Sequence, residues 1–277
     1  MQLVINWHIT ENCNYKCFFC FSEWKNAKEI WPCSADALQI IKEVSTINTN
    51  IGNHKFARPT RLNFAGGEPL VLGNKLVEYI RTAKEMGLET SLITNGFLLK
   101  KHIEVADSLD MLGISVDSLD ESTNMKIGRN CGSKVLSQGE LFEVVKSVQQ
   151  RNPNIKLKFN SVVNKYNWKS TVAKDLQKLL PNKVKILRQL PFKEEKGISD
   201  AEFAHFVRQN TSKGQTNVVV EDNEDMINSY LMIDPAGRFF ENGNPQEYFY
   251  SDPIHKVGID TAMKQVKFNP EIFKKRY

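Results

Sequence analysis

Strand-like and helix-like segments alternate along the first two thirds of the chain. The strand-like runs lie near residues 2–9, 60–65, 90–94, 111–116, 156–163 and 183–190. Between them, apolar residues recur at helical spacing over 36–47, 74–86, 137–150 and 168–180. This alternation is typical of a parallel sheet covered by helices. It predicts an α/β fold of six βα units, arranged as a partial barrel or as an open doubly wound sheet.

The pattern changes near residue 196. A helical stretch at 201–209 precedes a short strand at 218–220 and a hairpin of 231–233 and 238–240, turned at 234–237. We therefore divide the chain into a core over 1–195 and a C-terminal α+β extension over 196–277 that packs on the core.

The predicted strands are apolar on one face only. At 60–65, for example, Leu62 and Phe64 alternate with Arg61 and Asn63. A parallel sheet buried on both faces would instead show continuous apolar runs. The pattern favours a barrel-like sheet whose apolar face packs on helices and whose polar face lines a lumen.

Four basic side chains would face this lumen: Arg61, Lys158, Lys183 and Lys185. Leaving buried charges unpaired is costly, and the main acidic strand position that we find is Asp117. An anionic ligand, best one with several phosphates, would neutralise them. The alternative is that some of these strands are edges whose lysines reach solvent.

Three of the five cysteines, Cys13, Cys17 and Cys20, stand in a Cys-x3-Cys-x2-Cys pattern. Three thiolates on a loop suit a four-iron cluster with one iron open to a small-molecule ligand. A zinc site is the alternative, and it would need a fourth ligand such as Cys33 or His8. We interpret Cys33 and Cys131 as ordinary thiols.

Composition narrows the class of protein. The chain has 277 residues, 41% hydrophobic and 25% charged, with a formal net charge of +5. These values fit a folded enzyme-sized domain, and the charge is too mild to indicate nucleic acid. With no apolar run of about 20 residues and no secretory signal pattern, we expect a cytoplasmic protein that does not bind membranes.

Several short motifs follow the ends of predicted strands, where α/β folds place their ligands. They contribute the candidate residues Gly66, Gly67, Glu68, Ser115 and Arg129, and Tyr230 precedes the hairpin. Each has an ordinary alternative: the glycines could mark a turn, Arg129 could lie on the surface and Tyr230 in the core.

Together these motifs resemble a known family. Residues 13–20, with the aromatic Phe19 before the third cysteine, resemble the cluster loop of radical S-adenosylmethionine (SAM) enzymes, and 63–69 resembles their SAM-binding glycine motif. Five further blocks make the chain similar to viperins, specifically their prokaryotic relatives. They are Ser-x-Asp-Ser-x-Asp at 115–120, Ile-Gly-Arg at 127–129, Lys-x-Asn-Ser-Val at 158–162, Asn-Ser-Tyr-Leu at 228–231 and Arg-Phe at 238–239.

The resemblance implies a partial (βα)6 radical SAM barrel that dehydrates a nucleoside triphosphate to its 3′-deoxy-3′,4′-didehydro form, a chain terminator used in antiviral (anti-phage) defence. CTP is the favoured substrate, with UTP or GTP as alternatives, and the C-terminal extension would cover the nucleotide. The cofactors would be a [4Fe-4S] cluster and SAM. A flavodoxin- or ferredoxin-type electron donor would serve a monomeric enzyme that binds no nucleic acid.

The resemblance also implies roles by position. Cys13, Cys17 and Cys20 would bind the cluster; Phe19, Gly66, Gly67, Glu68, Ser115 and Arg129 would bind SAM; Arg61, Lys158, Asn160, Lys183 and Lys185 would bind the triphosphate; Tyr230 would donate a hydrogen atom late in the reaction. Two departures stand out: an amphipathic N-terminal helix is missing, and the C-terminal tail stops early, at Tyr277. Two other readings are a radical SAM enzyme with another substrate and a zinc-stabilised, non-catalytic nucleotide-binding protein.

Overall fold

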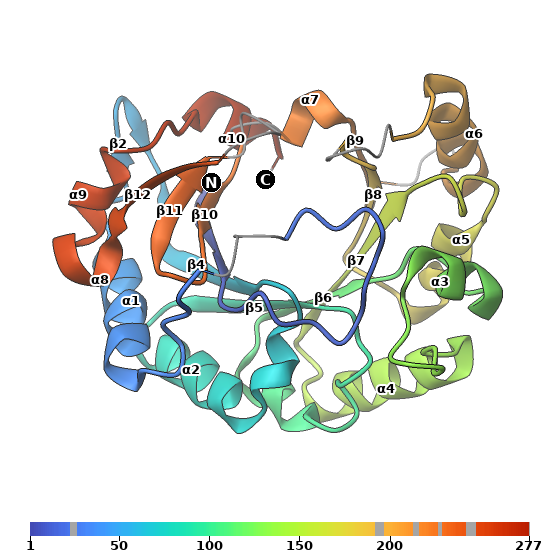
Figure 1. Ribbon diagram of the computed structural model, residues 1–277, viewed down its shortest axis with the longest axis horizontal. Helices are drawn as coiled ribbons and strands as arrows, with labels where there is room; N and C mark the ends of the chain where they lie inside the picture. Colours follow the sequence, from blue (N-terminus) through green and yellow to red (C-terminus); the bar gives the residue numbers. More distant parts are fainter. Residues whose placement is uncertain (23–26, 192–196, 213–215, 227–228, 242–247, 277) are drawn as a thin grey trace.

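A curved ten-stranded sheet forms the centre of the molecule (Figure 1). The computed structural model describes residues 1–22, 27–191, 197–212, 216–226, 229–241 and 248–276. The sheet has the order β12-β11-β10-β1-β4-β5-β6-β7-β8-β9. Its strands are β1 Gln2–His8, β4 Ala57–Ala65, β5 Glu89–Thr94, β6 Met111–Ser115, β7 Lys156–Val163, β8 Lys183–Arg188, β9 Val218–Glu221, β10 Leu231–Ile233, β11 Arg238–Glu241 and β12 Phe249–Pro253.

All neighbouring strands from β10 to β9 are parallel, and only the β10–β11 and β11–β12 pairs are antiparallel. A separate two-stranded ribbon pairs β2 Asn50–Ile51 with β3 His54–Lys55. The predicted α/β fold is confirmed, and the sheet curls as a partial barrel.

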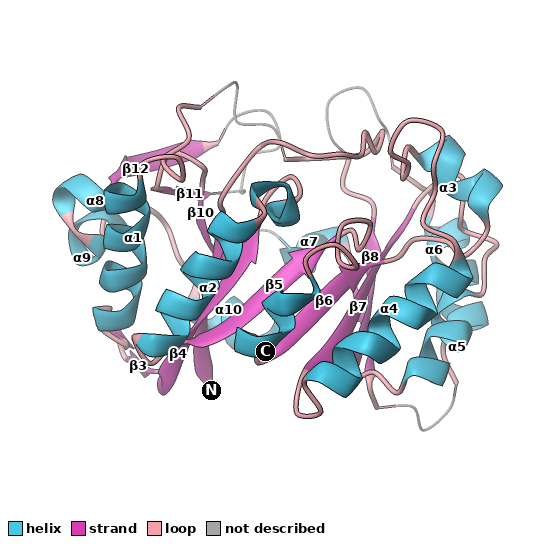
Figure 2. Cartoon of the chain, turned by 90° about the horizontal axis from the view of Figure 1, so that it is seen from below, coloured by secondary structure: helices cyan, strands magenta, loops and turns pink. Residues whose placement is uncertain are grey.

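Helices cover the outer face of this sheet, and both views show α1, α2, α4, α5 and α6 there (Figures 1 and 2). The helices are α1 Ser34–Thr46, α2 Asn74–Glu85, α3 Glu121–Ile127, α4 Gln138–Arg151, α5 Val172–Leu176, α6 Asp200–Asn210, α7 Asn223–Met226, α8 Ile254–Val257, α9 Ile259–Met263 and α10 Pro270–Arg276, with 3-10 helices η1 Pro69–Leu72, η2 Ile103–Ser108 and η3 Gln177–Leu179. Capping boxes begin α4 and α6, and each satisfies amide groups of a helix's first turn. None of these helices is long and apolar enough to cross a bilayer.

One predicted helix is shorter than expected. The periodicity over 168–180 yields only α5 and η3, because the preceding residues form a turn held by side chains. Asn167 accepts a hydrogen bond from the Asn164 amide (2.7 Å) and donates to the Asp117 carbonyl (2.8 Å). Such local side-chain bonds compete with helical ones.

The two faces of the sheet differ as the alternation predicts. Ile5, Trp7, Leu62, Phe64 and Phe159 are fully buried in the core between sheet and helices. On the other face, the Asn63 amide donates to Asn6 and its carbonyl oxygen accepts from Ser91, both at 2.8 Å. A row of polar groups on neighbouring strands therefore faces the lumen.

The C-terminal extension continues the same sheet at both of its ends. β9 pairs with β8, and β10 pairs with β1. The last helix packs Phe273 against Phe56, with ring centroids 5.5 Å apart. The boundary near residue 195 and residue 228 of the Asn-Ser-Tyr-Leu block lie outside the described residues.

Candidate active site

The cysteine loop follows β1 and lies against the glycine turn that follows β4. The Gly67 amide donates to the Thr10 carbonyl (2.7 Å), and the Glu68 amide donates to that of Asn12 (2.8 Å). A Cβ atom at Gly67 would lie 2.3 Å from the Asn12 oxygen, and one at Gly66 would lie 2.5 Å from the Thr10 oxygen. The space beside both glycines is thus filled by main chain, and the glycines hold the cysteine loop in place.

A third glycine supports the far part of the same loop. Gly128 caps α3 with φ 87°, and its carbonyl accepts a hydrogen bond from the Lys16 amide (3.0 Å). The Phe18 amide donates to the Ile127 carbonyl (3.1 Å). A Cβ atom at Gly128 would lie 2.1 Å from the Lys16 oxygen. The loop is therefore clamped between the ends of β4 and α3 by main-chain groups.

The three thiols of the motif lie on this clamped loop. Desolvation raises the pKa of Cys13 to about 11 and that of Cys17 to about 12, and both feel the charge of Cys20. Without a metal these two thiols stay protonated at neutral pH, so a cluster must displace their protons on binding. Sulfur donors of this kind suit iron–sulfur clusters, and the loop fits one.

The alternative, a zinc site, would need a fourth ligand beside the three thiols. Within the described residues, no three His, Cys, Asp or Glu side chains gather closely enough to hold one metal ion. A zinc site places four ligands about 2.0–2.3 Å from a single centre, whereas a cluster spreads its ligands over several irons. His8 is buried with its ring against Phe240, and burial lowers its pKa to about 4. Cys33 precedes α1 and Cys131 pairs with Lys134 in a turn.

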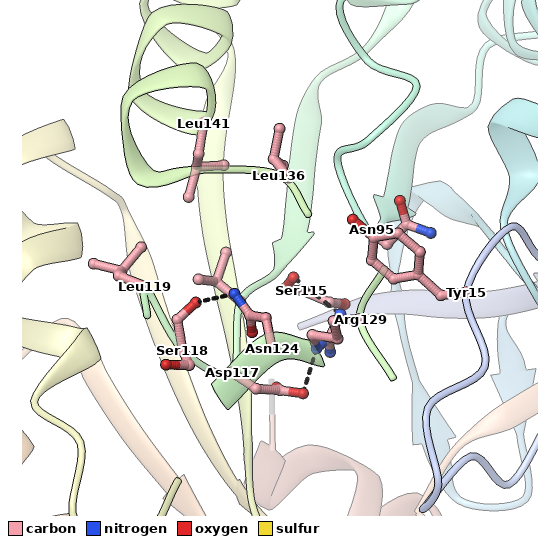
Figure 3. A pocket seen from close by; sticks show the side chains of 11 residues that line it. Tyr15, Asn95, Ser115, Asp117, Ser118, Leu119, Asn124, Arg129, Leu136 and Leu141 are labelled. Atoms are coloured by element: carbon pink, nitrogen blue, oxygen red, sulfur yellow. Dashed lines mark hydrogen bonds and ion pairs between the residues drawn. The ribbon is translucent and has the colours of Figure 1, made fainter. Parts of the chain in front are cut away.

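Arg129 and Asp117 form an ion pair at the wall of a cavity (Figure 3). The charge of Arg129 also acts on the thiols of Cys13 and Cys17. The Arg129 Nε donates to the Asp117 carboxylate, and Nη1 donates to the Ser115 carbonyl at 3.3 Å. Burial lowers the pKa of Arg129, but Asp117 together with Cys17 and Tyr15 outweighs this effect, so the pKa of Arg129 is raised. Both predicted residues, Ser115 and Arg129, line one cavity of about 20 Å³. Tyr15 and Asn95 line the same cavity. Both stand in motifs visible in the sequence, which gave neither of them a role.

Glu68 is fully buried in the glycine turn. Its carboxylate accepts hydrogen bonds from the Leu70 amide (3.0 Å), the Thr94 hydroxyl (2.7 Å) and the Asn95 amide (2.7 Å). Burial raises its pKa to about 7. Glu68 therefore ties the ends of β4 and β5 together beside the cysteine loop. Its predicted contact with SAM stays a prediction.

The four predicted lumen cations form one basic pocket at the other end of the strands. A cavity of about 230 Å³ is lined by Arg61, Lys158, Lys183 and Lys185 together with Met1, Gln2, Val4 and Met111. The register explains the cluster, because Lys158 pairs with Lys183, and Asn160 with Lys185, across β7 and β8. Asn160 also lies opposite Ser115 of β6. These cations are therefore not solvated edge residues.

Two carboxylates that sequence reasoning missed lie among these cations. Glu221 forms a buried ion pair with Lys185, and Glu89 lies 3.4 Å from Arg61. Asp117, the expected counter-charge, instead serves Arg129. The expectation that acidic partners are scarce was therefore wrong for Lys185 and Arg61. A signal existed, because Glu221 directly follows the predicted strand at 218–220 and Glu89 directly precedes the one at 90–94.

Lys158 and Lys183 differ from the other two cations of the basic pocket. Within the described residues, Arg61 and Lys185 have carboxylate partners, and no ion pair joins Lys158 or Lys183 to a carboxylate. Burial, together with the charges of Lys185, Arg61 and Lys183, holds the pKa of Lys158 well below its usual range, although Glu221 acts in the opposite direction. An anion placed here would restore its charge.

Tyr230 and Phe19 occupy different parts of the site. Tyr230 directly precedes β10 and packs against Met232 and Phe240 in a small aromatic cluster on the wall that also holds His8. Phe19 is half-buried on the cysteine loop, with its ring 5.3 Å from that of Phe18. Phe19 lies on the loop that follows the carboxyl end of β1, whereas Tyr230 lies at the amino end of β10, directly before Leu231, which pairs with Ile5 in the middle of β1. The roles predicted for both residues stay predictions.

Comparison with known proteins places this geometry in a class. The family model of the radical SAM superfamily matches residues 7–165, more than half of the chain. The fold is also that of native anSMEcpe with bound AdoMet (TM-score 0.64, 14% identity, 99% of this chain and 82% of the other) and of Streptococcus suis SuiB bound to S-adenosylmethionine (TM-score 0.65, 14% identity, 99% and 67%).

More similar relatives narrow the class. A protein of Fibrobacter sp. (strain UWH6), named S-adenosylmethionine-dependent nucleotide dehydratase, is 39% identical over 99% of this chain and 88% of its own. A relative of the same name from Pseudoalteromonas ulvae is 37% identical over 100% and 93%. The S-adenosylmethionine-dependent nucleotide dehydratase RSAD2 of Oncorhynchus mykiss is 30% identical over 98% and 78%. The chain belongs to the radical SAM superfamily and, within it, to the S-adenosylmethionine-dependent nucleotide dehydratases.

Proposed function

We propose that this enzyme dehydrates a nucleoside triphosphate, CTP first among the candidates, to its 3′-deoxy-3′,4′-didehydro analogue. One observation carries the proposal: a single lumen has a cysteine loop at the carboxyl ends of its strands and a basic pocket of four cations along the same strands. The first end suits a cluster and SAM, and the second suits a chain of phosphates.

The charges of the basic pocket support a polyphosphate. Four cations face two carboxylates, Glu89 and Glu221, so the pocket keeps an excess of positive charge. Lys158 and Lys183 are the two cations outside these ion pairs among the described residues, and burial together with the neighbouring positive charges lowers the pKa of Lys158. Phosphate oxygens form charge-assisted hydrogen bonds with such groups, and several phosphates in a row reach cations on neighbouring strands. A nucleoside without phosphates would leave the excess charge uncompensated.

The carboxyl end of the lumen would hold the cofactors. Cys13, Cys17 and Cys20 would bind a [4Fe-4S] cluster, which with SAM supplies the radical that removes the ribose 4′ hydrogen. Arg129, oriented by Asp117, would bind the SAM carboxylate together with Ser115. Their shared cavity beside Cys17 favours this assignment.

The remaining residues would orient the substrate. Asn160 lies between the two ends of the lumen. It is two residues after Lys158 on β7 and therefore on the same face, where it suits a phosphate or a sugar hydroxyl. Tyr230 would donate a hydrogen atom from the aromatic wall after the 3′ hydroxyl has left. Release of one proton would make this a net one-electron reduction, so that the product is lighter by one water. Close placement of the ribose and the radical lets transfer compete with quenching, which is why the phosphates must be fixed.

The test is an anaerobic incubation of the purified enzyme with dithionite, SAM and each of CTP, UTP and GTP in turn. Mass spectrometry should detect 5′-deoxyadenosine and a nucleotide lighter by one water. Primer extension by a phage polymerase with the purified product should stop after one incorporation, in keeping with a role in anti-phage defence. Equal stimulation of 5′-deoxyadenosine formation by a nucleoside, its monophosphate and its triphosphate would refute the assignment of the basic pocket.

A further inference from the structure

Asn95 connects the end of β5 to the cysteine loop. It directly follows Thr94, the last residue of β5, and its main-chain amide donates to the buried Glu68 carboxylate at 2.7 Å. Its side-chain Nδ2 donates to Asn14 Oδ1 at 2.8 Å and lies 4.0 Å from the Cys13 sulfur. Asn95 is therefore a residue of the sheet whose side chain reaches a predicted ligand of the cluster.

The hydrogen bonds of Asn95 fix which end of its side-chain amide faces the sulfur. The Oδ1 atom accepts from the main-chain amide of Phe97 at 3.0 Å, so this end is the carbonyl oxygen. The opposite orientation would turn the NH2 group towards the Phe97 N–H, a contact between two donors. Nδ2, which has two hydrogens, therefore faces the loop, where Asn14 accepts the first of them. The second is available to the Cys13 sulfur.

We propose that Asn95 is a positioning residue that donates a hydrogen bond to the Cys13 sulfur when a cluster occupies the loop, and that this bond raises the reduction potential of the cluster. Asn95 would in this way set how readily the cluster accepts one electron. The proposal rests on Cys13 as a ligand of the cluster. It does not depend on which nucleotide is the substrate.

The charge of the loaded loop favours this bond. A thiolate that binds iron is a stronger acceptor than a thiol, and hydrogen bonds to charged groups are shorter and stronger than neutral ones. The Tyr15 amide, 3.3 Å from the same sulfur, supplies another donor from the loop itself. A cluster gains negative charge on reduction, so a donor at its sulfur stabilises the reduced form more than the oxidised form. The bond therefore raises the potential.

The origin of Asn95 in the sheet suits it to this role. The main-chain donors of the loop move with the cysteines, whereas Asn95 is held at the end of β5 by its bonds to Glu68 and Phe97. A group fixed in this way orients a metal ligand and tunes the metal. Asn95 also lines the cavity that holds Arg129 (Figure 3). Its rival role is thus a contact with SAM, and a measurement of SAM affinity separates the two roles.

The test compares Asn95→Ser with Asn12→Ser in the reconstituted enzyme under anaerobic conditions. A serine hydroxyl at position 95 can still accept from the Phe97 amide, but it is too short to reach the Cys13 sulfur. Asn12 is exposed and directly precedes Cys13, so the control makes the same change beside the same ligand. In a second variant, Asn95→Asp, the carboxylate keeps the acceptor for Phe97 and removes the donor. Electron paramagnetic resonance of samples poised at known potentials, without SAM or nucleotide, gives the fraction of reduced cluster, and calorimetry gives the SAM affinity.

At the midpoint potential of the wild type, the ratio of reduced to oxidised cluster should fall about tenfold in Asn95→Ser, which is about 59 mV for a one-electron couple. It should fall further in Asn95→Asp, whose negative charge faces the sulfur. Asn12→Ser should keep the wild-type ratio, and every variant should keep its iron and its SAM affinity.

An unchanged ratio in both Asn95 variants, or an equal shift in Asn12→Ser, overturns the proposal. Weaker SAM binding with an unchanged ratio overturns it too and assigns Asn95 to SAM. Loss of iron from both Asn95 variants would show a purely structural role and count equally against it. The potentials are measured without nucleotide, so a failure of the proposed nucleotide reaction would leave this comparison intact.

Discussion

Gly128 is the position where one added methyl group should disturb the cysteine loop. It ends α3 with φ 87°, and a Cβ atom there would lie 2.1 Å from the Lys16 carbonyl oxygen and 2.8 Å from its carbon. These are main-chain atoms, so no side-chain rotation relieves the overlap. The loop must move away in Gly128→Ala, which breaks the bonds from the Lys16 and Phe18 amides to Gly128 and Ile127.

The structure also offers a matched control. Gly132 has φ 61° and nothing within 4 Å of the position of a Cβ atom. An alanine in this left-handed conformation costs about 1–2 kcal/mol at either position. The two lost hydrogen bonds add about 1 kcal/mol each at Gly128. We expect about 3–4 kcal/mol for Gly128→Ala and about 1–2 kcal/mol for Gly132→Ala.

The assay is urea unfolding of both variants and the wild type under anaerobic conditions, followed by iron analysis of the reconstituted proteins. Gly128→Ala should lose stability by the larger amount and bind less iron, because Cys17 directly follows the displaced Lys16. Gly132→Ala should keep its iron. Equal destabilisation of the two variants, with equal iron, would refute the role of Gly128 as a support of the cysteine loop.

Four further outcomes follow from the charges and thiols of the site. Lys158→Met should weaken triphosphate binding by about 10- to 150-fold, the value of one charge-assisted contact, and calorimetry should show this without loss of stability. The pKa of Lys158 lies below its ordinary 10.5, and bound phosphates should raise it again. Triphosphate binding should therefore take up a proton, and the affinity should fall as pH rises between the two pKa values. Titrations in buffers of different ionisation enthalpy should show proton uptake in the wild type and its loss in Lys158→Met. Lys185→Met should cost about 3–5 kcal/mol of stability because Glu221 stays buried without its lysine, whereas adding Glu221→Gln should restore most of it; no recovery in urea unfolding would contradict this. The Cys33→Ser/Cys131→Ser variant should bind as much iron as the wild type, and a folded variant without iron would show that one of them is a ligand.

The strands and the basic pocket could be predicted because both depend on local alternation. The run at 156–163 coincides with β7, and its pleat places Lys158 and Asn160 on one face. The start of β4 was missed by three residues because Arg58 and Pro59 interrupt the apolar pattern there. Alternation says which face a side chain shares, and it needs no knowledge of the neighbouring strand.

Partners across strands could not be predicted in the same way. Glu221 reaches Lys185 through the register of β8 and β9, which the order of residues does not specify. The glycines show the same limit. Gly67 was predicted from its motif as a SAM-binding residue, and the motif does not reveal that a Cβ atom there would meet Asn12, 55 positions earlier in the chain. Only the packing of the cysteine loop on the end of β4 reveals that contact.

The basic pocket and the cysteine loop lie at two ends of the same strands, so the length of these strands sets the distance between them. On β7, Lys158 and the carboxyl end at Val163 are five residues apart, a span of about 17 Å at roughly 3.3 Å per residue. Under the proposed function, a substrate whose phosphates are fixed in the basic pocket places a particular ribose carbon at the carboxyl end of the strands. Removing two residues from a strand keeps every side chain on its face but shortens this distance by about 7 Å. The choice of the carbon that reacts is in this sense a property of the sheet's dimensions as much as of the side chains around it.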